Sequence, residues 1–200
     1  MFSIQNLSEK EIEETVDAII LAIKISALLH DIGKLRKEWQ ESVGWKEGQP
    51  YIARTSNKRK VPFHAPYAYP FLKAFLRNIF GGYRVLDVIA SATARHHSLE
   101  VTGRVKEDDF TLADESVVNF LSSLLSKTVP ELQGYNLDEL IQCCIEDTNK
   151  GSPMDEPPTP SDDFYFIYTI ANRTVKFADW EDAGNEIIEL PEIVGEEDDT

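Results

Sequence analysis

The sequence predicts an all-α protein, a helical bundle with a metal site at its centre. Apolar residues recur at a spacing of three or four through several long segments, which is the period of a buried helix face. We find no hairpin pattern and no internal repeat. Three of the four histidines adjoin an aspartate or one another. The first two observations predict the fold class, and the third predicts the metal site.

The breaks between predicted helices come from capping residues, prolines and glycines. A capping-box pattern over residues 8–11 begins the first helix. Pro66 and Pro70 bracket the start of the third helix, and Gly81-Gly82 end it. Loops are predicted for residues 48–63, 98–112 and 151–160. The expected helices cover residues 9–30, 35–42, 69–80, 85–97, 137–146, one from a cap at Asp114 or Ser116 to 126, and one from a cap at Ser161 or Asp162 to 183.

Length and charge define the domain and exclude some functions. A chain of 200 residues suits one domain, which we expect over residues 1–184, with an acidic C-terminal tail or linker over 185–200. The formal net charge of −15 argues against a protein that coats nucleic acid non-specifically. We expect no membrane span and no secretory signal. The only cysteines, Cys143 and Cys144, are adjacent, which favours a cytoplasmic protein without a disulfide framework.

His30 and Asp31 follow an apolar helix, Ser26-Ala27-Leu28-Leu29. Burying a carboxylate beside an imidazole at the end of such a helix is costly unless something pairs with the charge. A divalent cation satisfies both groups, and this donor set suits Mn, Fe, Ni, Co or Zn. The pair therefore predicts a transition-metal site.

His96 and His97 form a second unusual pair, near the end of a predicted helix. Adjacent side chains on a helix point about 100° apart. Both imidazoles can reach one metal only if the helix ends or distorts there. The polar run after His97 favours a helix end, and two exposed histidines on a loop are the alternative interpretation.

Together these motifs resemble the CRISPR-associated HD nucleases, the nuclease part of the type I interference helicase-nuclease. His30-Asp31-Ile32-Gly33-Lys34 followed by Trp39-Gln40 is similar to their HD-x-G-K and aromatic-Gln signature. His64, the pair His96-His97 and the segment Phe177-Ala178-Asp179-Trp180 follow in the family's order, so that the resemblance covers residues 18–184.

The resemblance implies an HD-domain fold and a metal-dependent single-stranded DNA nuclease that works with a helicase and a CRISPR surveillance complex. It implies one or two divalent ions, Mn, Ni, Co or Fe, with Mg and Zn as further options. Asp31 would bridge two ions; His64, His96 and His97 would complete one shell, and His30 and Asp179 would join the other. The family has a further histidine upstream of the HD pair, whereas none precedes His30 in this sequence.

Basic residues near these motifs are candidates for contacts with DNA. Lys34 lies about one helical turn beyond the HD pair, and its ammonium reaches a phosphate oxygen if the chain stays helical or turns tightly there. We therefore interpret Asp31 and Lys34 as catalytic, with a solvent-exposed lysine as the alternative for Lys34. The segment 48–86 carries seven bases and no acid. A flexible cationic loop beside a metal site suits a DNA backbone. The loop candidates are Arg54, Lys58, Arg59 and Lys60.

Three other functions fit parts of the pattern. The HD pair alone suits a phosphohydrolase of nucleotides or cyclic nucleotides equally well. An HD domain of a type I-D large subunit, with a different order of motifs, would account for the missing upstream histidine. In a non-catalytic interaction domain the upstream histidine would be missing because the metal site had been lost. Retention of the other ligand-type residues argues against such a domain.

Overall fold

A computed structural model describes residues 9–53, 61–97, 110–150 and 162–184. Within these ranges the protein is all-helical, with one isolated antiparallel bridge between Arg36 and Leu112 in place of any sheet. The predicted fold class is therefore confirmed. The α-helices are α1 (Glu9–Leu28), α2 (Lys37–Ser42), α3 (Ala65–Phe80), α4 (Arg84–Ala94), α5 (Ser116–Thr128), α6 (Leu137–Lys150) and α7 (Tyr165–Gly184), and the 3₁₀ helices are η2 (Ile32–Leu35), η3 (Pro130–Leu132) and η4 (Asp162–Phe164).

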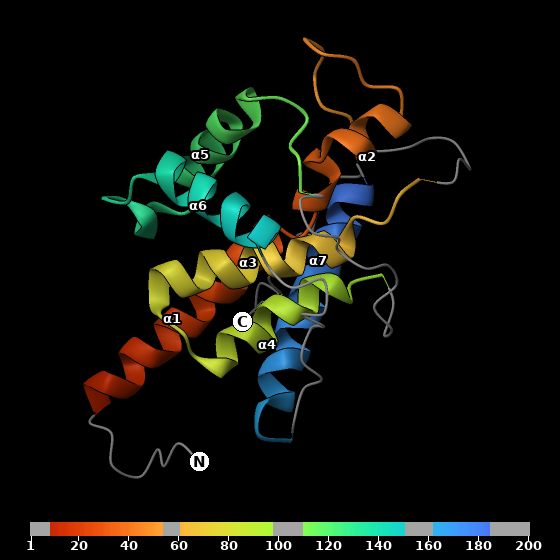
Figure 1. The fold of residues 1–200 in the computed structure, drawn as a ribbon. Helices are drawn as coiled ribbons and strands as arrows, with labels where there is room; N and C mark the ends of the chain where they lie inside the picture. The colour runs from red at the N-terminus through yellow and green to blue at the C-terminus, as the bar shows by residue number, and fades with distance from the viewer. Residues whose placement is uncertain (1–8, 54–60, 98–109, 151–161, 185–200) are drawn as a thin grey trace, which may run out of the picture.

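Helix α3 lies at the middle of the bundle. It contacts α6 on one side and α4 on the other; α5 adds to the first side, and α1 and α7 to the second (Figure 1). Because α3 is enclosed from several directions, its apolar residues are buried almost all round; Phe71, Leu72, Phe75 and Leu76 are at most 1% exposed.

The start of α3 differs from our expectation. The helix begins at Ala65, four residues before the predicted start at Tyr69. Pro66 lies in the first turn, where its missing N–H costs nothing, whereas Pro70 lies inside the helix. The end is as predicted: Gly81 follows the last residue with φ of 92°, a conformation that glycine adopts without strain.

Helices α1 and α4 end earlier than the periodicity predicts, α1 at Leu28 and α4 at Ala94. The residues that follow, His30 and His96, place their side chains back on the helix ends, as described below. These two early ends matter for the site because the side chains of adjacent residues beyond a helix end need not point about 100° apart. They can therefore point toward the same place.

Several expectations fall outside the described ranges. They are the capping residue Ser8, most of the predicted loops 98–112 and 151–160, the basic residues 54–60, and the proposed tail 185–200. In the described ranges no helix is both long and apolar enough to cross a membrane.

Candidate metal centre

His30 and Asp31 lie in the turn between α1 and η2. The imidazole of His30 donates from Nδ1 to the carbonyl oxygen of Ala27 at 2.7 Å. A continuing helix would give that carbonyl to the amide of residue 31, so the side chain ends the helix in place of the backbone. The residue is buried, and its Nε2 atom lies 3.6 Å from Asp31 Oδ2. The hydrogen bond from His30 to Ala27 therefore both ends the helix and orients the imidazole.

His96 repeats this arrangement at the end of α4. Its Nδ1 donates to the carbonyl oxygen of Thr93, again three residues earlier, and leaves Nε2 directed at Asp31 Oδ1 at 3.8 Å. Since α4 has ended, His97 is released to point at the same region. The helix end predicted from the adjacent histidines is confirmed, and both imidazoles reach one place.

His64 comes to the site because Gly33 allows the chain to approach η2 closely. A Cβ atom on Gly33 would lie 2.2 Å from the backbone oxygen of His64, so only glycine fits there. His64 immediately precedes α3, and its Nε2 lies 3.0 Å from Asp31 Oδ1. The glycine of the HD-x-G-K motif therefore permits the close approach of His64 to η2.

Asp179 enters from the second half of α7. Its Oδ1 lies 3.9 Å from His30 Nε2, and its Oδ2 lies 4.0 Å from His97 Nδ1. The carboxylate therefore faces both sides of the site.

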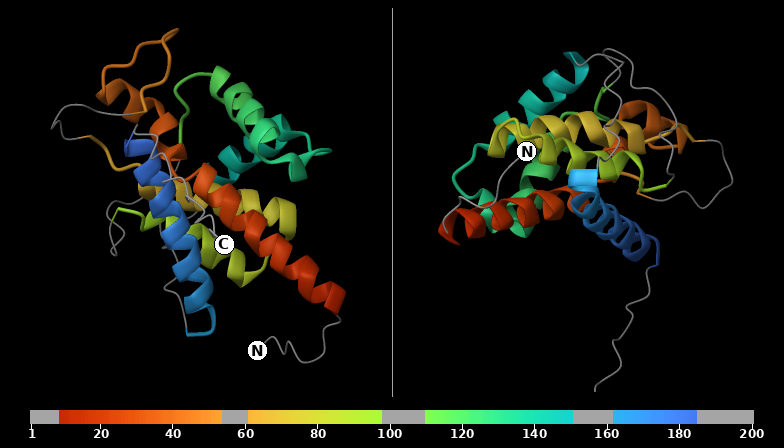
Figure 2. Two further views of the ribbon diagram at one scale, coloured as in Figure 1. Left: turned by 180° about the vertical axis from the view of Figure 1, so that it is seen from behind. Right: turned by 90° about the horizontal axis from the view of Figure 1, so that it is seen from below.

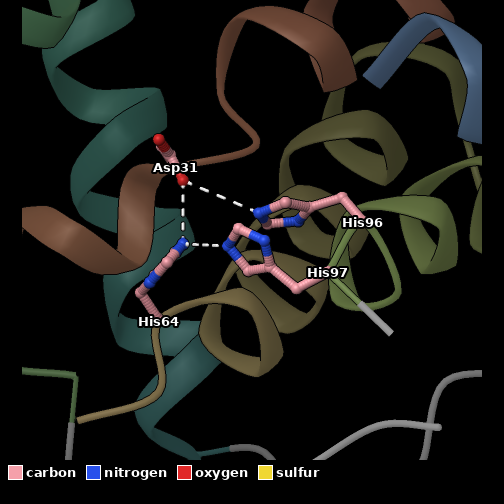
Figure 3. A group of neighbouring side chains, drawn as sticks. All are labelled: Asp31, His64, His96 and His97. Carbon is pink, nitrogen blue, oxygen red and sulfur yellow. Dashed lines mark hydrogen bonds and ion pairs between the residues drawn. The ribbon is translucent and has the colours of Figure 1, made fainter. Parts of the chain in front are cut away.

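These residues form two overlapping groups of donor atoms. One group is Asp31, His64, His96 and His97, and the other is His30, Asp31, His96 and Asp179. In each group the donor atoms lie within 4.8 Å of one another. Figure 3 shows the first group, with the Nε2 atoms of His64 and His97 2.9 Å apart and both near Asp31. Asp31 belongs to both groups, as expected of a bridging residue, and so does His96.

Buried nitrogens without partners show that the groups fit a cation. His30 Nε2 and His96 Nε2 are buried and form no hydrogen bond within the described part of the chain. Because Nδ1 of each ring donates to a carbonyl, Nε2 is left as an acceptor. A buried acceptor without a donor is costly, and a metal ion removes that cost. The mixed imidazole and carboxylate donors suit a transition metal.

The charges at the site favour the ligand forms of its residues. Burial alone would raise the pKa of Asp31, but the hydrogen bond with His64 and the charges of His30, His64 and Lys34 hold that pKa well below its usual range. Burial, with a smaller effect of His97, lowers the pKa of His96 to about 3. The carboxylate is therefore ionised and His96 neutral near pH 7, as metal ligation requires.

Lys34 lies in η2, and its ammonium forms an ion pair with Asp31 Oδ2. The side chain is 19% exposed, so it reaches the edge of the site without being enclosed. This position is compatible with the predicted contact to a phosphate oxygen.

Sequence reasoning missed the part played by Gln40, which we used only as a signature residue. Its amide donates to the carbonyl oxygens of Lys34 and Ile52, at 2.8 and 3.0 Å, and accepts from the Ile52 amide at 2.9 Å. The side chain thus joins η2 to the segment that precedes His64 in the chain. Trp39 beside it is buried, and its ring meets that of His64 edge-on with centroids 6.2 Å apart.

The predicted DNA-binding residues Arg54, Lys58, Arg59 and Lys60 lie outside the described residues. The other candidates, His30, Asp31, Lys34, His64, His96, His97 and Asp179, are brought together.

In a comparison with known proteins, residues 3–180 match the family model described as "Cas3, HD domain". No curated protein and no solved structure matches the chain. The family match spans well over half of the chain and includes every residue of both donor groups. The chain therefore belongs to the Cas3 HD domain family, and is a CRISPR-associated protein of the HD-type phosphohydrolases and nucleases.

Proposed function

We propose that this protein is a metal-dependent nuclease that hydrolyses phosphodiester bonds of single-stranded DNA, and that it acts with a helicase and a surveillance complex in type I CRISPR interference. The observation that carries the proposal is the pair of unpartnered imidazole nitrogens, on His30 and His96, directed into a family-type set of donors around Asp31. Such donors hold a divalent cation, and phosphodiester hydrolysis is a reaction that such cations catalyse.

The proposed ligand assignment follows the two groups. His64 and His97 would hold one ion and His30 and Asp179 another, with Asp31 and His96 available to both. When bound, a divalent ion neutralises charge on the phosphoryl oxygens and makes water a better nucleophile near pH 7. Mn, Ni, Co or Fe are the ions that we expect from the donor set.

The exposure of the ligands indicates where DNA would enter. The side chain of His97 is 48% exposed, whereas that of His30 is 2% exposed. The site is therefore closed behind His30 and open beside His97. On this open side we propose that Lys34 donates to a non-bridging phosphate oxygen and so orients the scissile phosphate.

The cytoplasm is the proposed setting. Cys143 and Cys144 are both free, which suits a reducing compartment.

The test is cleavage of circular single-stranded DNA by metal-stripped protein, with Mn, Ni, Co, Mg or Zn added in turn. We expect a transition metal to restore cleavage and Asp31→Ala to abolish it. Asp163→Ala is the matched control, because Asp163 is exposed in η4 and belongs to neither donor group. Cutting a circle would identify endonuclease action.

Two results would contradict the proposal. Cleavage that persists in Asp31→Ala would place the activity elsewhere. Protein that binds metal but cuts no DNA, while it hydrolyses nucleotides or cyclic nucleotides, would identify a small-molecule phosphohydrolase.

A further inference from the structure

The outer face of α7 carries a continuous apolar seam with one charged residue at its centre. Phe166, Ile170, Arg173, Phe177 and Trp180 follow one another at spacings of 4, 3, 4 and 3 residues. This alternation places side chains along one line of a helix and is the spacing by which helices pair along their length. The four apolar side chains are 75%, 41%, 59% and 69% exposed, in that order.

The opposite face of α7 packs against the bundle. Tyr168, Ala171 and Val175 are buried there, and α7 contacts α1 and α4. Seen from behind, α7 and α1 lie in front of the other helices (Figure 2). Because the seam lies opposite the buried face of α7 and its side chains are exposed, it faces away from the bundle. Among the described residues none covers the seam, although an exposed line of large apolar side chains usually marks a contact surface.

A second copy of this chain is a poor occupant of the seam. Arg173 is the middle position, with two apolar residues on either side. Pairing of two copies over the whole seam, parallel or antiparallel, therefore sets Arg173 against Arg173. Like charges facing each other in a contact that excludes water disfavour that pairing.

The segment that directly follows α7 has the complementary chemistry. Residues 185–200 contain seven acids and no base, and five of the eight residues from 187 to 194 are isoleucine, leucine or valine. Its carboxylates match Arg173 and the nearby Lys176, and its aliphatic side chains match the seam. The segment lies beyond the residues matched by the family, which end at 180.

The distances also permit the contact. From Trp180 back to Phe166 the seam is about 21 Å long, at 1.5 Å per helical residue. An extended chain spans about 3.3 Å per residue, so the 16 residues after Gly184 reach about 53 Å, enough to turn back and follow the seam. Covalent attachment adds a high effective concentration, which a separate partner lacks.

We propose that residues 185–200 fold back along α7 and cover its outer seam, with the aliphatic residues 187–194 on Phe166, Ile170, Phe177 and Trp180 and with carboxylates beside Arg173. The segment is then an intramolecular cover for a face that is apolar in the described bundle.

Trp180 reports on this contact directly. The other two tryptophans, Trp39 and Trp45, are 2% and 5% exposed, so Trp180 is the one whose fluorescence a cover on α7 can change. The experiment measures tryptophan emission and its quenching by acrylamide in the full chain and in the variant I187S/I188S/L190S, with W180F versions of both as blanks. Dilution over a wide concentration range is part of the same experiment.

We expect Trp180 in the full chain to be protected from acrylamide at every concentration, and the serine variant to shift its emission to longer wavelength and lose the protection. Arg173→Glu, a surface change within α7, should produce the same loss in part, most clearly at low ionic strength. Equal quenching in the full chain and the serine variant would overturn the proposal. Protection that appears only at high concentration, and equally in both proteins, would overturn it in favour of a second copy.

Discussion

Gly33 determines where His64 lies. A Cβ atom added to Gly33 would collide with the backbone oxygen of His64, which leaves no room for any side chain. The contact is with backbone, which cannot swing aside as a flexible side chain can. Gly33 is therefore a positioning residue for the metal centre, although it offers no ligand atom.

Gly33→Ala should move His64 away from Asp31. We expect a loss of about 1–3 kcal/mol in the free energy of unfolding, the usual cost of overpacking, and weaker binding of Mn. Gly82→Ala is the matched control, because nothing lies within 4 Å of a Cβ built there. Denaturant unfolding and calorimetric titration measure the two effects. Unchanged metal affinity in Gly33→Ala would show that His64 is not held by this contact.

The buried imidazole of His96 predicts a pH dependence of stability. Burial lowers its pKa to about 3 in the folded protein, well below the 6.5 that is usual for an imidazole. Between these values the unfolded chain binds the extra proton, so metal-free protein loses stability as pH falls from about 6.5, with a limit near 1.4 kcal/mol per pH unit for one proton. Above this range His96 contributes no pH dependence.

Urea unfolding of chelator-treated protein over this pH range checks the prediction. His96→Gln should give a shallower dependence, whereas Gln142→Ala, an exposed change on α6, should keep that of the parent chain. Parallel curves for the parent and His96→Gln would mean that His96 is not held neutral by burial.

At the scale of elements, the candidate metal centre is positioned by the ends of two helices and by the hydrogen bonds of one side chain, Gln40. The histidines at the ends of α1 and α4 take a carbonyl oxygen three residues back. Gln40 clasps η2 to Ile52 through three hydrogen bonds. Each device fixes a segment that carries or precedes a ligand, so the rigid helices of the bundle set the geometry of irregular turns.

Gln40→Ala should release the segment before His64. The carbonyl of Lys34 and both backbone groups of Ile52 would lose their partner, at about 1–3 kcal/mol for each group that stays buried. We expect a lower melting temperature and weaker metal binding, measured by circular dichroism and calorimetry. Gln142→Ala should change neither. If Gln40→Ala binds metal as tightly as the parent chain, the clasp serves stability alone.

The sequence predicted the elements better than their ends. Helical period, together with capping residues, prolines and glycines, predicted each α-helix of the described ranges. The unusual pairs His30-Asp31 and His96-His97 predicted residues that the structure brings into the two donor groups, because such neighbours are costly without a cation. The start of α3 was missed, since proline at both 66 and 70 is compatible with a start at either place. The clasp by Gln40 was missed because it depends on Ile52, which no local pattern connects with it.

At the scale of the molecule, the candidate metal centre joins segments that are distant in the chain. Its residues come from the turn after α1, the start of α3, the segment after α4, and α7. No local pattern could give their distances, because packing of the whole bundle around α3 brings them together. A cation bound there links four parts of the fold at once.

Metal should therefore stabilise the whole domain. An ion that binds only the folded state adds about 2.7 kcal/mol at a free concentration 100 times its Kd. We expect Mn to raise the melting temperature of the parent chain and of Asp163→Asn, and to have no effect on Asp31→Asn. Scanning calorimetry with and without chelator checks this; a rise that survives in Asp31→Asn would indicate binding at another place.

The most direct measurement is a calorimetric titration of metal-stripped protein with Mn, carried out in parallel on the parent chain, Asp31→Asn and Asp163→Asn. Because Asp31 belongs to both donor groups, its loss affects either ion. We predict saturable binding of one or two ions by the parent chain and by Asp163→Asn, and none by Asp31→Asn. Equal affinity in all three proteins, or no binding by the parent chain, would contradict a metal centre at Asp31.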